Sequence, residues 1–568
     1  MTFRDNVKQW LNPPFDQITK NQVNNLKKRP EDLEDAFYKD LSFGTGGMRG
    51  LMNVGPNRIN KYTLGKATQG LSLFLTNEYP NETLKVVIAY DSRHQSREFA
   101  KIVADIFTAN KIHCYLFSDL RPTPELSFAV RHLDAHCGIV LTASHNPPEY
   151  NGYKVYGKDG GQLAPPLDYK IIQTIKKTTF DSIRFKGNSN LLHYVDKEID
   201  DAYHQTVIEV AQMHKLSKDD FQVAFTPIHG TSITALPQVL KKAGYKNVHI
   251  VPEQEIPDGS FPTVSSPNPE EPQALQMALV LAKEKNADLV IGTDPDADRF
   301  GIIIKDSKNK WKFLNGNQIM MILTEYLLNK NQSQGVLTPM HFIATTIVST
   351  PAIEKMAMHF NIQFKKCLTG FKWIAKLVED YPELHFIGGG EESFGYLVGD
   401  TVRDKDAISA SLLACEIAVE AKAKGTNLFE LLIDCYKKYG AYKERLISIT
   451  KAGKSGLKQI NTIMNGFRKN SPQTISSIRV IDVEDYQKGI SKNLLTLKET
   501  KIHLPKANVL IFKLEDGTQI ALRPSGTEPK IKYYFSVNQE YNSEQTWEHQ
   551  EITMEKRLND FETSFKKL

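Results

Sequence analysis

The sequence predicts an α/β protein of three related mixed α/β domains followed by a smaller C-terminal α+β domain. From Val86 onward, short apolar segments alternate with helical ones, which is typical of a mostly parallel sheet with helices on both faces. Three segments along the chain also share one layout, in which an apolar strand leads into a polar loop and returns as a second apolar strand. The stretch after about residue 455 differs, because it combines a helix, several strands and a terminal helix.

The chain begins with a helical region and a glycine-rich segment. Residues 1–40 are expected to form amphipathic helices, anchored by Trp10, Leu11, Leu33 and Phe37. In the segment Phe43-Gly44-Thr45-Gly46-Gly47-Met48-Arg49-Gly50, glycines allow backbone amides to approach an anion, and Arg49 can bind a phosphate with two hydrogen bonds. The spacing matches neither a Walker A loop nor a dinucleotide-binding fingerprint, so a plain turn and a phosphate contact both remain open.

The first α/β domain is expected to have strands at residues 85–90, 113–117 and 138–141, with a helix over 97–110. The third strand leads into the polar segment Thr142-Ala143-Ser144-His145-Asn146-Pro147-Pro148-Glu149-Tyr150-Asn151-Gly152-Tyr153-Lys154, whose last residues begin a returning strand. The double proline and the Asn-Gly turn signal favour a stiff loop that holds Ser144 outward, near His145 and Lys154. Such a hydroxyl at a strand end suits a nucleophile or a phosphate-carrying serine.

The other two α/β domains and the C-terminal domain each present a polar loop. In the second domain, strands at 288–291 and 300–305 are expected to flank Gly292-Thr293-Asp294-Pro295-Asp296-Ala297-Asp298-Arg299. In the third, residues 385–387 lead into Gly388-Gly389-Gly390-Glu391-Glu392-Ser393-Phe394-Gly395-Tyr396. The C-terminal domain is expected to have strands at 477–481 and 509–513, followed by the loop Arg523-Pro524-Ser525-Gly526-Thr527-Glu528-Pro529-Lys530.

Composition indicates a globular protein with small-molecule partners. A chain of 568 residues is too long for one hydrophobic core, and 40% apolar with 24% charged residues is typical of folded domains. The net charge of +5 is spread along the chain, which gives no case for a nucleic-acid partner.

Cysteine usage and the absence of apolar runs predict a reducing, cytoplasmic location. Five cysteines lie far apart without a C-x-x-C pair, so we expect buried thiols and no disulfide framework. No signal-peptide pattern opens the sequence, and no apolar run approaches the roughly 18 residues of a membrane span. We therefore expect no membrane partner.

The alternating carboxylates Asp294, Asp296 and Asp298 can converge on one hard cation. Calcium in the EF-hand manner is excluded, because Arg299 and Lys305 stand where that loop needs glycine and glutamate. Magnesium with a phosphate oxygen as a further ligand fits better.

The two remaining loops suit a phosphorylated sugar. Glu391, Glu392 and Ser393 lie among glycines and offer hydrogen-bond acceptors and a donor without bulk, which suits sugar hydroxyls, although a solvated turn is an equal alternative. The C-terminal loop offers a guanidinium, two hydroxyls and close backbone amides, which together form a small anion cradle. Its groups come from Arg523, Ser525, Gly526 and Thr527.

The four loops, in this order, resemble those of the α-D-phosphohexomutases, the superfamily of phosphoglucomutases and phosphomannomutases. The similarity covers nearly the whole chain. Additional segments also agree with the subgroup that contains phosphoglucomutase-2-like and phosphopentomutase enzymes: residues 43–50, His229-Gly230-Thr231, Thr369-Gly370-Phe371-Lys372 and Val402-Arg403-Asp404-Lys405-Asp406. The motifs that carry the resemblance are Thr142-Ala143-Ser144-His145-Asn146-Pro147, Asp294-Pro295-Asp296-Ala297-Asp298-Arg299, Gly390-Glu391-Glu392-Ser393 and Arg523-Pro524-Ser525-Gly526-Thr527-Glu528-Pro529.

This resemblance implies four domains around a central cleft, with expected limits of 1–205, 206–320, 321–450 and 451–568. It implies a phosphoglucomutase that interconverts glucose 1-phosphate and glucose 6-phosphate through a phosphoserine and glucose 1,6-bisphosphate, which would also serve as activator. Ser144 would carry the phosphoryl group, and that phosphate with the three aspartates would hold Mg²⁺. A monomer or weak dimer is expected.

The resemblance also implies roles for the surrounding residues. Arg49 and Arg299 would neutralise charge on the moving phosphoryl group, and Lys154 and Lys405 are the acid–base candidates, with His145 close to the phosphoserine. An ammonium can act as a base only if its pKa is lowered, so simple phosphate contact remains the alternative for both lysines. The substrate-binding residues would be Arg299, Thr369, Gly370, Glu391, Ser393, Arg523, Ser525, Gly526 and Thr527.

Two positions depart from the family pattern. The segment Gly390-Glu391-Glu392-Ser393 is called the sugar loop below. Some members carry a histidine just after the serine of this loop, whereas this chain has Phe394 there, so no histidine role is carried over. Lys532 stands where many members have a phosphate-binding arginine, and a lysine cannot make the planar two-pronged contact.

The sequence leaves other functions open. Ribose, deoxyribose or mannose phosphate could replace glucose phosphate as substrate, because the sugar loop does not decide between them. An aspartyl phosphatase is a rival enzyme class, since Asp294-x-Asp296 follows an apolar strand, but it leaves the Ser144 loop unexplained. A catalytically inactive sugar-phosphate sensor is disfavoured, because every chemical position is filled.

Overall fold

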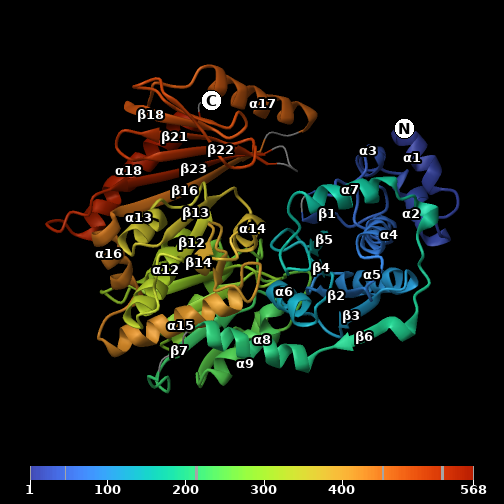
Figure 1. Cartoon of the computed structure of the whole chain (residues 1–568), viewed down its shortest axis with the longest axis horizontal. Helices are drawn as coiled ribbons and strands as arrows, with labels where there is room; N and C mark the ends of the chain where they lie inside the picture. The colour runs from blue at the N-terminus through green and yellow to red at the C-terminus, as the bar shows by residue number, and fades with distance from the viewer. Residues whose placement is uncertain (1, 45, 212–214, 451–452, 526–529, 567–568) are drawn as a thin grey trace. The chain divides into compact units, whose positions relative to one another are not determined.

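The computed structural model describes residues 2–44, 46–211, 215–450, 453–525 and 530–566 (Figure 1). The chain divides into two compact units, Met1–Ile319 with Phe371–Asn427 and Met320–Gly370 with Leu428–Leu568. It passes from the first unit to the second inside α12 (Gly316–Ser333). The architecture is the expected one of three α/β domains and a C-terminal α+β domain.

Three short helices open the chain, as predicted: α1 (Phe3–Trp10), α2 (Gln17–Leu26) and α3 (Pro30–Phe37). Trp10 is fully buried and stacks on Phe15, with ring centroids 4.4 Å apart. Phe37 meets Trp10 edge-on in the same cluster, and the predicted anchors Leu11 and Leu33 pack against it while staying partly exposed. This aromatic cluster is separate from the main core of the first α/β domain.

The first sheet has the strand order β1-β5-β4-β2-β3-β6. Its β4, β2, β3 and β6 run parallel, whereas β5 pairs antiparallel with β4 and β1. The strands are β1 (Gly47–Leu51), β2 (Lys85–Tyr90), β3 (His113–Phe117), β4 (Cys137–Leu141), β5 (Tyr150–Tyr156) and β6 (Leu192–Val195).

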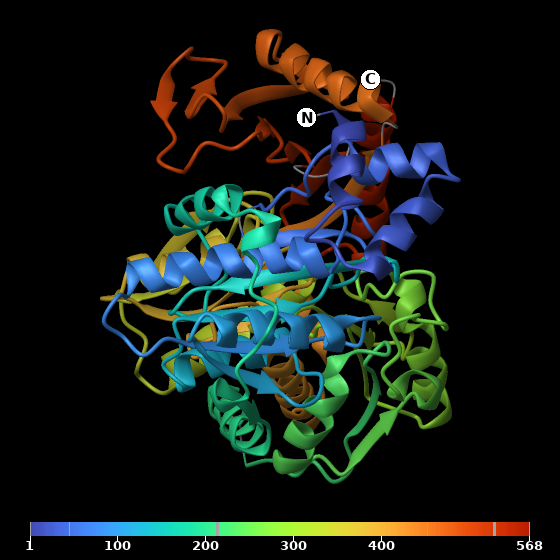
Figure 2. The ribbon, with the colours of Figure 1, turned by 90° about the vertical axis from the view of Figure 1, so that its right-hand side faces the viewer.

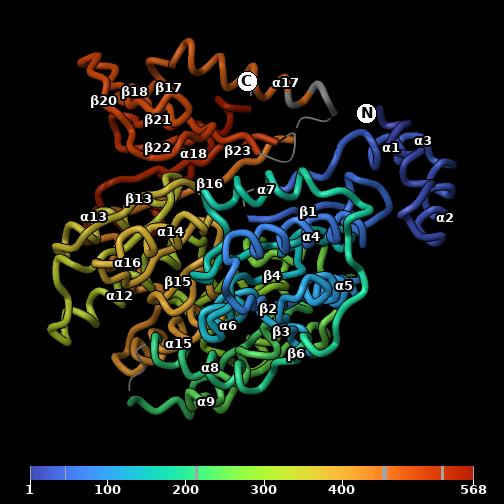
Figure 3. The backbone as a smooth tube through the Cα atoms, turned by 45° about the vertical axis from the view of Figure 1, so that its right-hand side comes forward, coloured from blue at the N-terminus to red at the C-terminus, as the bar shows by residue number. Residues whose placement is uncertain are grey.

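Helices connect and cover these strands. Helix α4 is a long, straight helix (blue in Figure 2) that packs against both α5 and α7, as the tube view shows (Figure 3). Helices α5 and α6 both contact β2. The helices of this domain are α4 (Lys61–Glu78), α5 (Ser96–Ala109), α6 (Thr123–His132), α7 (Leu167–Lys177) and α8 (Lys197–Val210).

The structure corrects two predictions about loops in this domain. Asn151 and Gly152, which indicated a turn, lie inside β5, and Arg49 lies in β1 rather than in a loop. The Asn151 side chain donates to the carbonyl of His94 and to Ser96 Oγ, so its amide is used in packing and not in a turn. Gly152 stands opposite Arg49, and a Cβ on it would lie 2.4 Å from the Thr142 carbonyl oxygen. The glycine is required for this close approach.

The second sheet has the order β11-β10-β9-β7-β8, and β10 returns antiparallel to β9 as predicted. Its strands are β7 (Gln222–Thr226), β8 (Asn247–Ile250), β9 (Leu289–Thr293), β10 (Phe300–Lys305) and β11 (Trp311–Phe313). Its helices are α9 (Leu236–Lys242), α10 (Pro252–Glu255) and α11 (Gln276–Glu284).

The first unit is completed by elements that follow Phe371. Strand β14 (His385–Gly390) pairs antiparallel with β15 (Tyr396–Val398), and the predicted sugar loop connects them. Helix α14 (Lys372–Asp380) precedes this pair, and α15 (Ala407–Ala423) follows it. Asp406 caps the N-terminus of α15 and accepts a hydrogen bond from Tyr203 of α8.

The second unit contains the parallel pair β12 (His341–Thr346) and β13 (Gln363–Cys367) with α13 (Ala352–His359) and α16 (Leu428–Tyr439). Its antiparallel sheet follows the order β16-β23-β22-β21-β18-β19-β20, and β17 pairs with β18. Helices α17 (Gly453–Lys469) and α18 (Trp547–Lys566) accompany it. Its strands are β16 (Ala441–Thr450), β17 (Thr474–Ile475), β18 (Ile478–Asp485), β19 (Ile490–Asn493), β20 (Glu499–Lys501), β21 (Leu510–Leu514), β22 (Gln519–Pro524) and β23 (Lys530–Gln539).

All five cysteines are buried and free, as predicted. Among the described residues, no helix combines the length and the apolar composition that a membrane-spanning segment needs.

A Gly152→Ala substitution is expected to destabilise the first domain. The added methyl group would meet the carbonyl oxygens of Thr142 and Met48, and forcing atoms into a filled space costs about 1–3 kcal/mol. Thermal unfolding checks this, with Gly466→Ala in α17 as the control, because no described atom beyond the backbone of its own helix lies within 4 Å of a Cβ there. Alanine is the better helix former, so the control should unfold at an equal or higher temperature. Equal melting temperatures for Gly152→Ala and the unsubstituted protein would contradict the close-approach argument.

Candidate active site

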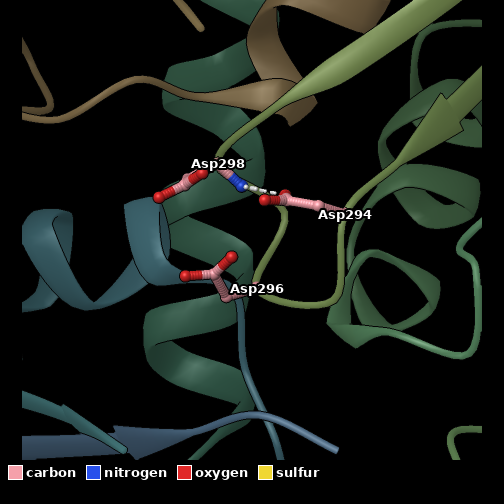
Figure 4. A group of neighbouring side chains, drawn as sticks. All are labelled: Asp294, Asp296 and Asp298. Carbon is pink, nitrogen blue, oxygen red and sulfur yellow. Dashed lines mark hydrogen bonds between the residues drawn. The ribbon is translucent and has the colours of Figure 1, made fainter. Parts of the chain in front are cut away.

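Three buried aspartates lie together in the loop between β9 and β10 (Figure 4). Asp294, Asp296 and Asp298 each offer a carboxylate oxygen, and these atoms lie within 4.8 Å of one another. Asp294 Oδ1 also accepts the backbone N–H groups of Asp298 and Arg299, each at 3.0 Å, which fixes the turn. Ala297 adopts a left-handed φ of 54° at its tip. The loop therefore holds the three carboxylates at a small spacing.

These carboxylates fit a divalent cation. Asp296 Oδ1 and Asp298 Oδ1 are buried and accept no hydrogen bond from the described residues. Burial and the charges of Asp298 and Asp296 raise the pKa of Asp294 well above its ordinary value. Burial also opposes ionisation of Asp298, but the charges of Lys154, Lys405 and Arg299 outweigh it and hold the pKa of Asp298 well below its usual range. Hard oxygen donors in such a cluster are the ligands that Mg²⁺ prefers.

Ser144 lies directly beside this cluster. It follows β4, and its Oγ donates to Asp294 Oδ2 at 2.8 Å and lies 3.2 Å from His145 Nδ1. The backbone of Ser144 is in the left-handed region, with φ of 52°, and its N–H donates to Thr142 Oγ1. The side chain does not point outward as predicted: the residue is 2% exposed, because it faces the aspartate loop of the next domain. The sequence could not indicate this contact between segments 150 residues apart.

Lys154 and Lys405 converge on the same aspartates. Lys154 Nζ, from β5, donates to Asp296 at 2.6 Å and to Asp298 at 2.9 Å, and Lys405 Nζ donates to Asp298 at 2.7 Å. Burial lowers the pKa of both amines, but the aspartate charges outweigh it, so both pKa values are raised. In this state both lysines are ammonium groups, and the lowered pKa that a general base requires is not found.

Two arginines also lie beside the serine and aspartate loops. Arg49 of β1 donates to Asn146 Oδ1 in the serine loop at 2.7 Å. Arg299 pairs with Glu270, and its Nε lies 3.9 Å from Asp294 and 3.8 Å from Asp298. Burial lowers the pKa of Arg299, but the charges of Glu270 and the aspartates raise it above its ordinary value. Both guanidinium groups are thus close to the serine and aspartate loops.

The β14–β15 loop lies next to the end of the aspartate loop. The N–H of Phe300, the first residue of β10, donates to the carbonyl of Phe394 at 3.1 Å. Glu391 is buried, and Ser393 follows it in the same turn. Gly395 is required here, because a Cβ on it would lie 2.4 Å from Cδ of Lys405. This glycine lets the Lys405 side chain pass over the loop and reach Asp298.

The remaining predicted site residues belong to the second unit. Thr369 and Gly370 follow β13, and Gly370 has a φ of 108° that favours glycine. Arg523 lies in β22 and stands opposite Lys532 of β23. Like charges directly opposite in a sheet repel, and a bound anion would offset this repulsion. The Ser525 N–H donates to the Lys530 carbonyl at 2.7 Å, whereas Gly526 and Thr527 lie outside the described residues.

Two groups of site residues were not predicted from the sequence. Thr123, at the start of α6, donates its N–H to the carbonyl of Asp296 and its Oγ1 to Asp296 Oδ2, at 2.9 and 3.1 Å. Tyr156 of β5 donates to Asp404, and Lys405 Nζ lies 3.4 Å from the same residue. The Arg-Pro-Thr-Pro pattern marks only a helix start, so the Thr123 contacts had no local signal.

Comparison with known proteins gives the family. Models of phosphoglucomutase/phosphomannomutase α/β/α domains I, II and III match residues 40–182, 201–308 and 315–439. A phosphoglucomutase of Staphylococcus epidermidis RP62A is 38% identical over 536 residues, which cover 93% of this chain and 96% of the relative. A phosphoglucomutase of Staphylococcus aureus USA300 is 37% identical over 535 residues, with 93% and 95% covered.

Solved structures share the fold at low sequence identity. The phosphoglucomutase pp63/parafusin of Paramecium has a TM-score of 0.66 at 18% identity, covering 89% of this chain and 93% of its own. A phosphoglucomutase/phosphomannomutase family protein of Burkholderia thailandensis has a TM-score of 0.66 at 17% identity, covering 92% and 96%. Together with the matched domain models and the bacterial relatives, this similarity shows that the chain belongs to the phosphoglucomutase/phosphomannomutase family of α-D-phosphohexomutases and is an isomerase of the intramolecular phosphotransferase type.

Proposed function

We propose that this protein is a phosphoglucomutase that interconverts glucose 1-phosphate and glucose 6-phosphate through a phosphoserine enzyme and glucose 1,6-bisphosphate. The observation that carries the proposal is the hydrogen bond from Ser144 Oγ to Asp294, which joins the nucleophile to a buried acidic triad. Bacterial relatives named phosphoglucomutase, at 38% and 37% identity, support the choice of substrate.

The chemistry would take place at Ser144. In the phosphorylated enzyme, the free hydroxyl oxygen of the sugar phosphate attacks phosphorus while the bond between phosphorus and Ser144 Oγ breaks. The sugar hydroxyl loses its proton to a base, and the serine oxygen regains one. The reverse transfer from the other phosphate of the bisphosphate then restores the phosphoserine. Alignment and charge neutralisation dominate such transfers, and Arg49 and Arg299 are placed to supply positive charge.

Asp294, Asp296 and Asp298, with the phosphate on Ser144, would hold Mg²⁺. Bound there, Mg²⁺ supplies charge neutralisation for the phosphoryl group. Lys154 and Lys405 contact the same aspartates and are proposed to donate protons and hold phosphate oxygens. Neutralising the aspartates would remove the charge that raises both pKa values, which is the condition under which either amine could accept a proton. His145, beside Ser144, is proposed as a further polar contact.

A mutase of this type needs a second site for the phosphate that is not reacting. Arg523 and Ser525 are proposed for this role together with Gly526 and Thr527, and the opposed Arg523 and Lys532 support it. Lys532 would act as a point charge. Substrate hydroxyls would be held by Glu391 and Ser393, with Thr369 and Gly370 as further contacts. The intermediate must turn around between the two half-reactions, so both phosphates alternate between the sites.

Further proposals complete this assignment. Glucose 1,6-bisphosphate would prime the serine as an activator, and the protein would act in the cytoplasm as a monomer or weak dimer. The domain limits are proposed to be residues 1–205, 206–320, 321–450 and 451–568.

Pentose or mannose phosphate is the alternative substrate class within the family. An aspartyl phosphatase is disfavoured, because it gives no role to the Ser144 hydroxyl that lies 2.8 Å from Asp294 Oδ2.

Ser144→Ala is expected to abolish conversion of glucose 1-phosphate to glucose 6-phosphate, because the variant lacks the oxygen that carries the phosphoryl group. A coupled assay of glucose 6-phosphate measures the loss, and phosphopeptide mapping of the unsubstituted protein should place the phosphate on Ser144. Ser182→Ala changes a serine whose hydroxyl, among the described residues, donates to the local Thr179 carbonyl alone, and it should keep full activity. Retained turnover in Ser144→Ala, or release of inorganic phosphate in place of isomerisation, would contradict the proposal.

Chelation is expected to abolish activity, and added Mg²⁺ should restore it, because three buried carboxylates require a counter-charge. Mg²⁺ should also raise the melting temperature of the chelator-treated protein, since a ligand that binds only the folded state stabilises it. Asp296→Asn should weaken this shift. Asp288→Asn, which alters an aspartate paired with Lys422 outside the cluster, should leave the shift unchanged. An identical shift in both variants would exclude the triad as the site.

Glucose 1-phosphate is expected to be turned over with a higher kcat/KM than ribose 1-phosphate or mannose 1-phosphate. Each substrate should be measured with the same preparation in saturating Mg²⁺ and trace hexose or pentose bisphosphate as appropriate. A higher kcat/KM for ribose 1-phosphate would reassign the protein as a phosphopentomutase while leaving the phosphoserine chemistry intact.

A further inference from the structure

Arg93 lies directly beneath the serine loop and is not used in the chemistry described above. It follows β2, where the chain leaves the sheet, and it is 3% exposed. Among the described residues, its Nη1 and Nη2 donate to four backbone carbonyl oxygens of the loop that carries Ser144. A charged group in so buried a position requires partners, and here the loop backbone and Asp91 provide them.

The guanidinium spans almost the whole serine loop. Nη2 donates to the carbonyl of Ser144 at 2.6 Å and to that of Asn146, and Nη1 donates to the carbonyls of Pro147 at 2.8 Å and Tyr150 at 3.0 Å. One side chain therefore connects four carbonyl groups between the nucleophile and the first residue of β5. Only a planar group with several fixed donors can do this, whereas a lysine amine is a single point.

The position of Arg93 is itself fixed from other sides. Its Nε lies 3.4 Å from Asp91 Oδ2, and its backbone N–H donates to Asp91 Oδ1. Asp91 Oδ1 also accepts Ser96 Oγ at the start of α5. On the other face, the guanidinium carbon lies 5.0 Å from the centroid of the Phe261 ring. The strand end, a helix start and a segment of the second domain together hold the guanidinium.

The loop needs such support. Ser144 adopts φ of 52°, a left-handed conformation that non-glycine residues hold only when the surroundings determine it. Within the loop, the N–H of Asn146 donates to Ala143 and that of Tyr150 donates to Pro147, which leaves the carbonyl of Ser144 directed at Arg93. The hydroxyl then lies 2.8 Å from Asp294.

We propose that Arg93 is a positioning residue for phosphoryl transfer: its guanidinium fixes the backbone of Ser144 in the left-handed conformation that aims the nucleophile at the aspartate cluster. The inference deepens the proposed function and rests on Ser144 being the phosphoryl carrier. In this role Arg93 contacts the backbone carbonyl of Ser144 and not its hydroxyl, so it acts through the loop.

Arg93→Lys tests the proposal, because it keeps the charge but cannot span four carbonyls. A misplacement of the nucleophile by about 1 Å is expected to lower kcat for glucose phosphate isomerisation by about 10- to 100-fold, with KM changed less than about threefold. The rate at which glucose 1,6-bisphosphate phosphorylates the dephosphorylated enzyme should fall by the same factor. In Arg93→Ala, added guanidinium ion should restore part of kcat, whereas added ammonium ion should not.

Arg58→Lys is the matched control. Arg58 is also nearly buried, pairs with Asp35 at 2.6 Å and donates to the backbone carbonyl of Asn57 at 3.0 Å, but among the described residues its partners do not include the serine loop. Both lysine variants should lose some thermal stability, and only Arg93→Lys should lose kcat and the phosphorylation rate.

Three outcomes would overturn the proposal. One is a kcat for Arg93→Lys within twofold of the unsubstituted enzyme while Ser144→Ala is inactive. Another is an equal fall in kcat for Arg93→Lys and Arg58→Lys, which would indicate a general effect of buried arginine on folding. A third is full turnover by Ser144→Ala, which would overturn the proposed function and this inference with it, whatever Arg93→Lys shows. If Arg93→Ala does not fold, the lysine pair alone decides between these results.

Discussion

The first unit of this protein depends on a balance of charge around three buried aspartates. Asp294, Asp296 and Asp298 lie within hydrogen-bonding distance of Ser144, Lys154 and Lys405, all of them almost removed from water. Buried carboxylates at this spacing are costly unless cations or hydrogen-bond donors face them. The lysines and Arg299 supply part of that charge, and two aspartate oxygens stay without a hydrogen bond among the described residues. A divalent cation would complete the balance.

Backbone hydrogen bonds also bring several other segments to the aspartate loop. Thr123 at the start of α6 binds Asp296 through both backbone and side chain, and the N–H of Thr231 donates to the carbonyl of Pro295 at 2.8 Å. The N–H of Ala407 donates to the carbonyl of Ala297, so α15 begins against the tip of the turn. Each contact satisfies a backbone group that would otherwise be buried without a partner. The position of the three carboxylates is therefore fixed by helix starts and neighbouring loops as much as by the aspartate loop itself.

Glycine allows these segments to approach one another. Gly152 lets β1, β5 and the serine loop lie close together, and Gly395 lets the Lys405 side chain cross the sugar loop. Gly230 lies against Pro295, where a Cβ would be 2.5 Å from the proline Cα. These positions exclude larger residues for steric reasons, so each glycine contributes to the geometry of the acidic cluster without taking part in its chemistry.

The sequence by itself determined the fold class, the strands that carry the loops of the three α/β domains and the identity of the loops, because apolar periodicity and ordered motifs are local properties of the chain. It did not indicate β22 and β23, so Arg523 and Lys530, which were expected in a loop, lie in strands. It also indicated Ser144, the aspartate triad and both lysines. Only the tertiary structure decided that Ser144 is buried against Asp294, that Asn151 and Gly152 lie inside β5, and that Lys154 and Lys405 share Asp298. Arg93 and Thr123 likewise gained their importance from the fold. These outcomes depend on contacts between residues far apart in the chain, and on the electric field of charges that no local pattern brings together.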